Sequence, residues 1–253
     1  METGDNVLIG GFIVTGTQPK KIIVRAIGPS LSSFFPDALA NPVLELRDSS
    51  GALIRSNDNW RSDQEAEITA TGLPPADDLE SAIVATLSAN NSAYTAIVRG
   101  VNNGTGVGLV EAYDLDRTVD SKLANISTRG FVQTGDNAMI GGFIVVTQPT
   151  RVIIRAIGPS LSQFGVPDAL ANPQLELHDA TSTIARNGDW QTTQIFGIIT
   201  SDQVAEIQNS QLAPTNPAEA AIIATLAPGS YTAIMRGVNN TTGNALVEVY
   251  ALP

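Results

Sequence analysis

The chain has 253 residues, of which 43% are hydrophobic and 15% are charged, and its formal net charge at pH 7 is −11. This composition is typical of a globular protein, and the length is sufficient for two domains. The acidic balance argues against nucleic acid as a partner, because a phosphate backbone needs a basic surface. No apolar run approaches the roughly 18 residues that span a bilayer, and the absence of cysteine excludes disulfides and cysteine-ligated zinc.

The string RAIGPSL occurs twice, at residues 25 to 31 and again at residues 155 to 161. Each copy follows a β-branched run and ends in Gly-Pro, which stops a strand because proline has no N–H for the ladder. The surrounding segments can be aligned over almost the whole chain, so the pattern indicates a duplication. We therefore predict two repeats, residues 1 to 119 and residues 120 to 253.

Each repeat opens with a Gly-Asp-Asn turn and an apolar strand, at residues 4 to 16 and 135 to 147. A Gly-Gly pair within this strand suggests a bulge or the close approach of another backbone. The RAIGPSL strand follows and completes a hairpin. The long connection after it carries Leu31, Phe34 and Leu39 in the first copy, and we expect these apolar side chains to cover the open end of a sandwich.

The next strand alternates leucine with charged residues, as LELRD (residues 44 to 48) or LELHD (residues 175 to 179), which places the leucines inside. A short strand leads to Trp60 or Trp190. The segment that follows is nine residues longer in the second copy, so we expect it on the surface. Residues 62 to 68 have the Ser-x-x-Glu form of a capping box and predict one short helix.

Three more strands close each repeat, beginning in the first copy at Ala82, Tyr94 and Leu109. Each copy therefore has seven or eight short strands separated by turn signals, with almost no helical periodicity. This pattern predicts an all-β fold of two tandem antiparallel β-sandwich domains, of jelly-roll or immunoglobulin-like kind.

The stretch LANISTRGF (residues 123 to 131) leads into the second copy and has no counterpart before Met1. We expect the chain to be a piece of a longer array. If LANISTRGF is an integral strand, the first copy lacks its leading strand and presents an unpaired edge, which is a template for another chain. Subunits could then associate head to tail, a heterologous contact that propagates as a fibre unless it closes into a ring.

The residues give little support to catalysis. The single histidine, His178, occupies the strand position at which the first copy has Arg47, an outward site, so a Ser-His-Asp mechanism is not expected. Paired carboxylates could serve a glycosidase, but cross-strand ion pairs with nearby arginines are the simpler interpretation. The glutamates in question recur at matching repeat positions: Glu45 and Glu176, Glu111 and Glu248. We therefore predict that the chain is not an enzyme.

Two candidate binding sites remain. Hard oxygen ligands grouped in turns are typical of calcium sites, although aspartate and asparagine also favour turns for conformational reasons. The candidate calcium ligands are Asp48, Asn57 and Asp58 in the first copy and Asp179, Asn187 and Asp189 in the second. Trp60 and Trp190, each beside asparagine and aspartate, could stack against sugar rings or pack beneath the variable segment.

The strings LELRDSSGALIRSNDNW (residues 44 to 60), LANISTRGF and RAIGPSL resemble the tandem repeats of large secreted bacterial surface proteins. The second half of each copy is also similar to the pre-peptidase C-terminal domains of secreted peptidases, through the Asp48 to Gly51 turn, the NDN string and the final Tyr-Thr hairpin. That resemblance implies a calcium-binding β-sandwich that attaches an enzyme to matrix or assists secretion. The second copy departs from it, with Gly188 in place of Asp58 and Ser182 in place of the turn glycine.

The leading hypothesis is a non-catalytic extracellular or cell-surface module with a structural or adhesive role, such as a filament or surface-layer subunit. Its expected partners are other copies of itself and extracellular polysaccharide or matrix. The competing hypothesis is a calcium- or glycan-binding module appended to a secreted enzyme.

Overall fold

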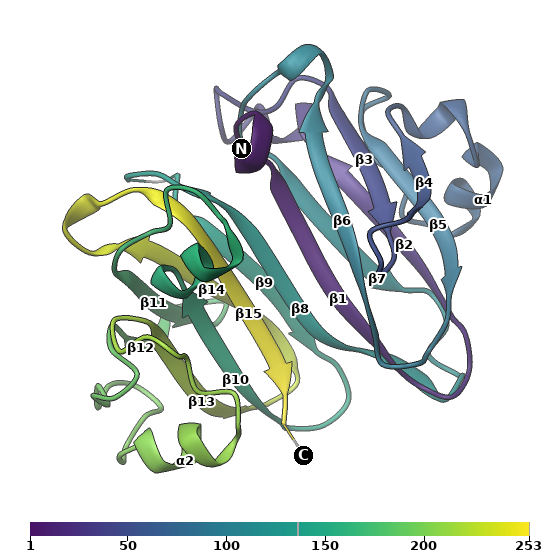
Figure 1. Cartoon of the computed structure of the whole chain (residues 1–253). Coiled ribbons are helices and arrows are strands. Elements are labelled where there is room, and N and C mark those ends of the chain that lie inside the picture. The colour runs from purple at the N-terminus through teal and green to yellow at the C-terminus, as the bar shows by residue number, and fades with distance from the viewer. Residues whose placement is uncertain (136, 253) are drawn as a thin grey trace. The chain divides into compact units, whose positions relative to one another are not determined.

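The computed structural model describes residues 1–135 and 137–252, and in these ranges the chain is all-β, with short helices in the connecting segments (Figure 1). The strands are β1 (Leu8–Gly16), β2 (Lys20–Ile27), β3 (Pro42–Arg47), β4 (Leu53–Asn57), β5 (Ser81–Leu87), β6 (Ser92–Gly100), β7 (Leu109–Asp114), β8 (Ser121–Val132), β9 (Met139–Val145), β10 (Thr150–Ile157), β11 (Pro173–His178), β12 (Thr183–Asn187), β13 (Ala220–Leu226), β14 (Gly229–Gly237) and β15 (Gly243–Ala251). The α-helices are α1 (Glu65–Ala70) and α2 (Val204–Asn209). The 3₁₀ helices are η1 (Gly4–Asn6), η2 (Pro29–Leu31), η3 (Trp60–Ser62), η4 (Val101–Asn103), η5 (Pro159–Phe164) and η6 (Val238–Asn240). Within the described ranges no helix has the length and apolar character of a membrane-crossing segment.

The chain divides into two compact units, Met1–Ala124 and Asn125–Pro253. In the first unit, strands lie in the orders β5-β2-β7 and β1-β6-β3-β4. In the second unit the orders are β13-β10-β15-β8 and β9-β14-β11-β12. Neighbouring strands in both units pair antiparallel, so the predicted all-β antiparallel fold class is confirmed.

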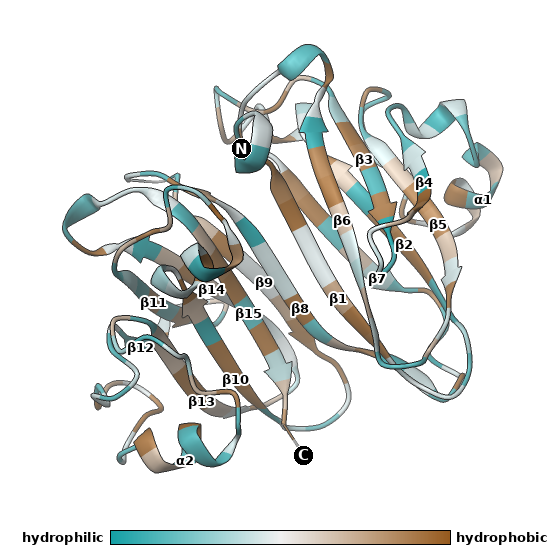
Figure 2. Cartoon of the chain, viewed as in Figure 1, coloured by the Kyte–Doolittle hydropathy of each residue, from teal (hydrophilic) through white to brown (hydrophobic). Residues whose placement is uncertain are grey.

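One apolar cluster in each unit draws side chains from both sets of strands, which gives a β-sandwich-like arrangement. The predicted alternation of the LELRD strand is present: Leu44 and Leu46 of β3 are fully buried, while the residues between them face outward. β11 repeats this pattern, with Leu175 and Leu177 fully buried. Figure 2 shows the result as brown bands that alternate with paler or teal ones along the strands.

The β-branched run before RAIGPSL is buried on both faces. Ile22 and Val24 of β2 belong to the inner cluster, whereas Ile23 packs outward against Trp60 and Ile68 in a second, smaller cluster. Ile153 of β10 makes the equivalent outer cluster with Trp190 and Ile207 in the second unit. Burial on both faces explains why this strand is a continuous apolar run instead of an alternating one.

The helix predicted after Trp60 is present, but its cap is not the predicted one. α1 begins at Glu65, after Gln64, which has a left-handed φ of 57°. Ser62 instead lies in η3 and donates its hydroxyl to the carbonyl of Asn59 at 2.6 Å. The capping-box interpretation was therefore wrong, because the preceding 3₁₀ turn uses the serine first.

The first glycine of the Gly-Gly pair lies against a side chain, whereas the sequence suggested a bulge or the close approach of another backbone. A Cβ on Gly10 would lie 2.9 Å from a methyl group of Val110 on β7, and a Cβ on Gly141 would lie 2.9 Å from a methyl group of Val247 on β15. The glycines therefore make room for a valine from the facing sheet.

The connection after RAIGPSL covers the core with only part of its apolar content. Leu39 is 1% exposed and Leu170 is fully buried, as expected for residues that close the end of the sheets. Phe34 and Phe164, however, are 78% and 81% exposed. The expectation that Phe34 covers the core was therefore wrong, because its place in the short turn after η2 points it into solvent.

Candidate functional site

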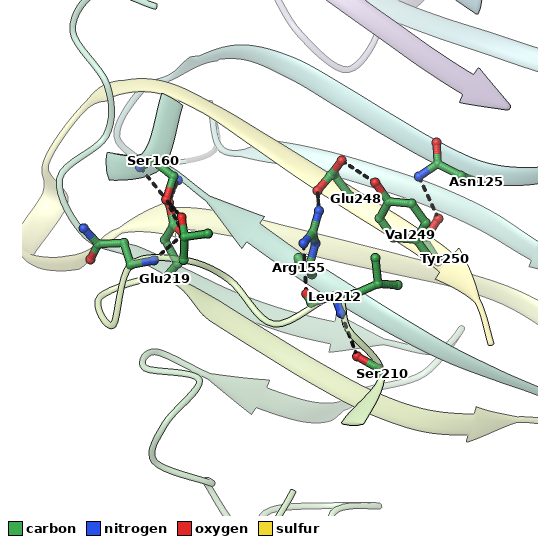
Figure 3. Close-up of polar contacts among 12 residues, drawn as sticks. Asn125, Arg155, Ser160, Ser210, Leu212, Glu219, Glu248, Val249 and Tyr250 are labelled. Atoms are coloured by element: carbon green, nitrogen blue, oxygen red, sulfur yellow. Dashed lines mark hydrogen bonds and ion pairs between the residues drawn. The ribbon is translucent and has the colours of Figure 1, made fainter. Parts of the chain in front are cut away.

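A buried glutamate holds the RAIGPSL segment in each unit. Glu219 is fully buried, and its Oε1 accepts hydrogen bonds from the backbone N–H groups of Gly158 at 3.1 Å and Ser160 at 2.9 Å. Its Oε2 accepts the Ser160 hydroxyl at 2.8 Å (Figure 3). Glu80, also fully buried, makes the same two backbone contacts, to Gly28 at 3.2 Å and Ser30 at 2.9 Å.

This contact explains why RAIGPSL is identical in the two copies. The glutamate stands at the start of β5 or β13, so its carboxylate ties that strand to the end of β2 or β10. The glycine is required for a steric reason: a Cβ on Gly28 would lie 2.2 Å from the carbonyl oxygen of Leu39. Sequence analysis missed these glutamates, although both precede an Ala-Ile-x-Ala-Thr-Leu strand.

An arginine, a glutamate and a tyrosine form a second repeated cluster. Arg155 donates to the Glu248 carboxylate and to the carbonyl of Leu212 at 2.9 Å. The Tyr250 hydroxyl donates to the other Glu248 oxygen at 2.8 Å (Figure 3). The first unit repeats the cluster: Arg25 Nε donates to the Glu111 carboxylate at 3.0 Å, and the Tyr113 hydroxyl donates to Glu111 at 2.7 Å.

Burial keeps these tyrosines protonated. It raises the pKa of the Tyr250 hydroxyl to about 12, and the negative charge of Glu248 acts in the same direction. Burial, followed by the hydrogen bond to Glu111, also raises the pKa of Tyr113. The phenols therefore remain hydrogen-bond donors throughout the neutral pH range. Each cluster also joins a strand to a connecting loop, because its arginine donates to a backbone carbonyl of that loop.

Glu45 and Glu176, the other two glutamates considered as catalytic carboxylates, also form ion pairs, as the ion-pair interpretation predicted. The Glu45 carboxylate accepts hydrogen bonds from the guanidinium groups of Arg47 at 2.8 Å and Arg99 at 3.2 Å. Glu176 accepts Arg236 at 3.4 Å and lies 3.1 Å from the Nε2 atom of His178. His178 is thus a partly exposed strand residue beside a carboxylate.

The two aspartates proposed as calcium ligands at the β3–β4 and β11–β12 turns each fold the turn with one carboxylate oxygen. Asp48 Oδ1 accepts the Ser50 hydroxyl at 2.6 Å and the Ala52 N–H at 3.0 Å. Asp179 Oδ1 accepts the N–H and the hydroxyl of Thr181, both at 2.8 Å. The hydrogen bond from the Ser50 hydroxyl lowers the pKa of Asp48, and the backbone N–H of Thr181 lowers that of Asp179.

The two asparagines of the candidate set are buried at the other end of the short strand. Asn57 is 5% exposed and bridges two strands: its Oδ1 accepts the N–H of Ala82 at 3.1 Å. Asn187, 4% exposed, accepts the N–H of Ala221 at 3.2 Å in the same way. The β3–β4 register pairs Leu44 with Asn57 and Arg47 with Leu53, so the strand β4 separates Asp48 from Asn57.

Asp58 and Asp189 are exposed next to these asparagines. The six candidate ligands are therefore not brought together as one oxygen cluster in either unit. Within residues 1–135 and 137–252, no group of three or more histidine, cysteine, aspartate or glutamate side chains has a metal-binding arrangement. Calcium binding at these turns stays a prediction.

Trp60 and Trp190 are 3% and 6% exposed. Trp60 packs in the outer cluster with Ile23 and Ile68, and the Arg61 guanidinium lies 4.2 Å from its ring centroid. The Trp190 indole N–H donates to the carbonyl of Asn216 at 3.2 Å. Glycan stacking stays a prediction, and the rings as they lie here present no open face to a sugar.

Replacing Asp179 by alanine tests the turn role of this aspartate. We expect a lower midpoint of thermal unfolding at pH 7, because three donors lose their acceptor. Since the folded pKa is lowered, this contribution is present above the unfolded value of about 3.9 and is lost as the pH falls through the folded value. The difference from the unmodified chain should therefore shrink as the pH is lowered below the unfolded value.

The exposed Asp58→Ala change is the control for Asp179→Ala and should leave the midpoint almost unchanged. Repeating the melts with a chelator separates the turn from a calcium site. A midpoint that depends on calcium in the unmodified chain, and no longer does in Asp179→Ala, would contradict a purely conformational role.

The two units differ at one strand edge. In the second unit, β15 pairs with β10 on one side and with β8 on the other, from Gly243↔Val132 to Tyr250↔Asn125. In the first unit, β7 pairs with β2 through Arg25↔Glu111 and its neighbours. The described residues of that unit place no further strand beside β7.

Burial follows this difference. Val247 and Val249 of β15 are 2% and 8% exposed, whereas Val110 and Ala112, which occupy the same positions of β7, are only half-buried. Leu109 is 40% exposed. β8 therefore covers the outer side of β15, whereas the corresponding residues of β7 are only half-buried.

The backbone of β7 also has unused bonding capacity. Leu115 donates its N–H to the carbonyl of Lys21 at 3.0 Å. In an antiparallel ladder the backbone groups of successive residues point alternately to the two sides of the strand, so the odd-numbered residues of β7 bond to β2. The N–H and C=O groups of Gly108, Val110 and Ala112 consequently point away from β2. We call these groups the β7 edge.

A buried lysine anchors the far end of this strand. Lys20 is fully buried, and its Nζ donates to both carboxylate oxygens of Asp114, at 3.0 and 2.9 Å, and to the carbonyl of Asp116 at 2.5 Å. Thr150 takes the place of this lysine in the second unit. The end of β7 and the segment that leaves it are therefore fixed to β2.

No protein-family model and no curated protein sequence matches the chain. Among solved structures, similarity was found to the major capsid protein P2 from Bacteriophage PM2, at 9% identity and a TM-score of 0.25, covering 100% of this chain and 94% of that one. A second similarity is to PNGF-II, at 8% identity and a TM-score of 0.24, covering 98% of this chain and 57% of that one.

Proposed function

We propose that this chain is a non-catalytic structural module of an extracellular or cell-surface protein, built from two tandem β-sandwich domains that associate end to end. The observation that carries the proposal is the β7 edge, a row of backbone donors and acceptors beside half-buried valine and alanine side chains. Exposed edges of this kind pair with further strands, so a chain with such an edge at one unit is suited to assembly.

The repeated polar contacts support the same role. The buried glutamates Glu80 and Glu219 and the arginine–glutamate–tyrosine clusters recur in both units, and all of them join a strand to a neighbouring strand or loop. The repeat thus uses its most buried charges for internal cohesion. A head-to-tail arrangement then needs only one complementary contact for each added copy.

Size-exclusion chromatography with light scattering, followed by negative-stain microscopy, tests the association. We expect the mass to rise with protein concentration and end-to-end particles to form. Ala112→Pro should reduce association, because proline removes an N–H from the β7 edge without touching the bonds to β2. A strict monomer at high concentration, or association that Ala112→Pro leaves unchanged, would contradict end-to-end contact through this edge.

A further inference from the structure

The strand β9 has an open edge on the side away from β14. In the second unit the strand order β9-β14-β11-β12 places β9 at the end of its sheet. The carbonyl of Val14 in the first unit accepts an N–H from the residue before β6 at 3.1 Å, and Val145 is its equivalent, so the odd-numbered residues of β9 bond to β14. The N–H and C=O groups of Ile140, Gly142 and Ile144 consequently point away from β14. We call these groups the β9 edge.

The exposed face of β9 is apolar and uncharged. Ile140, Ile144 and Val146 are 49%, 63% and 50% exposed, and a Cβ on Gly142 would stand in open space. Residues 137 to 150 contain no charged side chain. An exposed apolar edge without charges is a template for pairing with another strand. In a chain with a net charge of −11, a neutral surface also lets two copies approach with little repulsion.

The edges of β5 and β13 are closed by side chains of their own units. The Gln64 amide donates to the carbonyl of Val84 on β5 at 2.9 Å and accepts the N–H of Val84 at 3.2 Å. Gln203 makes the same two bonds with Ile223 on β13. A side-chain amide therefore takes the place of a neighbouring strand at both edges, and neither is open to β7.

The β7 edge and the β9 edge have side chains of complementary size. In an antiparallel pair, residues that exchange hydrogen bonds lie opposite each other with their side chains on the same face. One register sets a large side chain opposite a small one at every bonded position. The three opposed pairs in this register are Gly108 with Ile144, Val110 with Gly142, and Ala112 with Ile140.

This register also buries the exposed isoleucines. Val110 and Ala112 pack at the margin of the inner cluster of the first unit. Ile140 and Ile144 of a paired β9 would lie on the same face and extend that cluster. β8 makes the same kind of contact in the second unit, where it pairs with β15 and its Ile126 packs against the inner cluster. Pairing of β9 with another β9 would instead leave the isoleucines on an exposed face.

We propose that the β7 edge accepts the β9 edge of a second copy of this chain, antiparallel and with Val110 opposite Gly142. The contact joins the first unit of one copy to the second unit of the next. One chain thus carries both halves of a heterologous contact, which repeats along a fibre or closes a ring. This inference rests on the proposed association through β7 and names the partner of that edge.

Cysteine cross-linking tests the register, because the chain has no cysteine of its own. Val110→Cys and Gly142→Cys are prepared as separate proteins, mixed under mild oxidation and analysed by non-reducing electrophoresis. Opposed residues of a ladder have the Cα separation that a disulfide requires, so we expect at least about tenfold more covalent dimer in the mixture than in either variant alone.

The matched control is Val146→Cys, which lies on the same exposed face, four residues beyond Gly142. That distance is about 14 Å along an extended chain, so a mixture with Val110→Cys should give no covalent dimer. A covalent dimer of Val110→Cys alone would mean that β7 pairs with β7. Equal cross-linking by Gly142→Cys and Val146→Cys would mean that the contact has no fixed register, and either result overturns the proposal.

Proline variants supply a second, independent measurement. Ile144→Pro removes an N–H of the β9 edge without touching the bonds to β14, so it should abolish the rise of mass with concentration and leave the midpoint of thermal unfolding almost unchanged. Ala112→Pro blocks the other half of the contact. Each variant retains the half that the other lacks, so mixing the two should give a dimer that neither forms alone.

The outcomes separate this inference from the proposed function. If the unmodified chain associates and Ala112→Pro weakens the association, but Ile144→Pro does not and the mixture forms no new dimer, the β7 edge has another partner. The inference then fails and association through β7 stands. A strict monomer of the unmodified chain at high concentration overturns both.

Discussion

Replacing Glu219 by alanine is expected to lower the free energy of unfolding of the second unit by about 3 kcal/mol, because buried donors lose a charged acceptor. The carboxylate is fully buried and holds Gly158 and Ser160 at the exit of β10. Without it, two backbone N–H groups must find other partners or remain unsatisfied, and the Ser160 hydroxyl keeps only its hydrogen bond with Thr215. Denaturant unfolding followed by circular dichroism measures the change.

Glu219→Gln is the matched control. It keeps one carbonyl oxygen for the two backbone N–H groups and loses only the second acceptor, so we expect roughly half of the alanine effect. Glu80→Ala should destabilise the first unit by a similar amount, because Glu80 makes the same backbone contacts there. Alanine variants as stable as the unmodified chain would show that the carboxylates do not hold the RAIGPSL segment.

Proline substitution at the same repeat position of β7 and β15 should have very different effects in the two units. Val249→Pro removes an N–H that faces β8 in the second unit, and we expect a loss of about 3 kcal/mol in the free energy of unfolding. Ala112→Pro removes the corresponding N–H of the β7 edge, which has no strand to receive it, and should cost less than about 1 kcal/mol.

Val249→Ala controls for the lost side chain, which is 8% exposed. Its effect should be smaller than that of Val249→Pro, because the hydrogen bond to β8 remains. Equal destabilisation by Ala112→Pro and Val249→Pro would mean that β7 is paired on both sides, and would contradict association through the β7 edge.

The sequence predicted the strands well where burial is periodic. The alternating leucines predict β3, and the β-branched run predicts β2, from the local pattern alone. The duplication then predicts the equivalent strands β11 and β10 in the second repeat. It also predicted that the repeated glutamates form cross-strand ion pairs with nearby arginines, and the structure pairs Glu111 with Arg25. These features depend on short-range periodicity and on comparison of the two copies.

The sequence could not show what depends on three-dimensional closeness. In the sequence, nothing distinguishes Glu80 from an acidic residue of a surface loop. Only the fold brings its carboxylate to the backbone amides of Gly28 and Ser30. Asp48 and Asn57 are near in sequence but lie at opposite ends of β4. Phe34 looks like a core residue until the turn after η2 directs it outward.

Amide hydrogen exchange of the unextended chain, read residue by residue, tests the central claim most directly. At concentrations at which the chain is monomeric, Val110 and Ala112 of β7 should exchange at least about tenfold faster than Val247 and Val249 of β15, because only the latter pair has a strand on its outer side. Comparable slow exchange at all four amides would contradict the account of an open β7 edge.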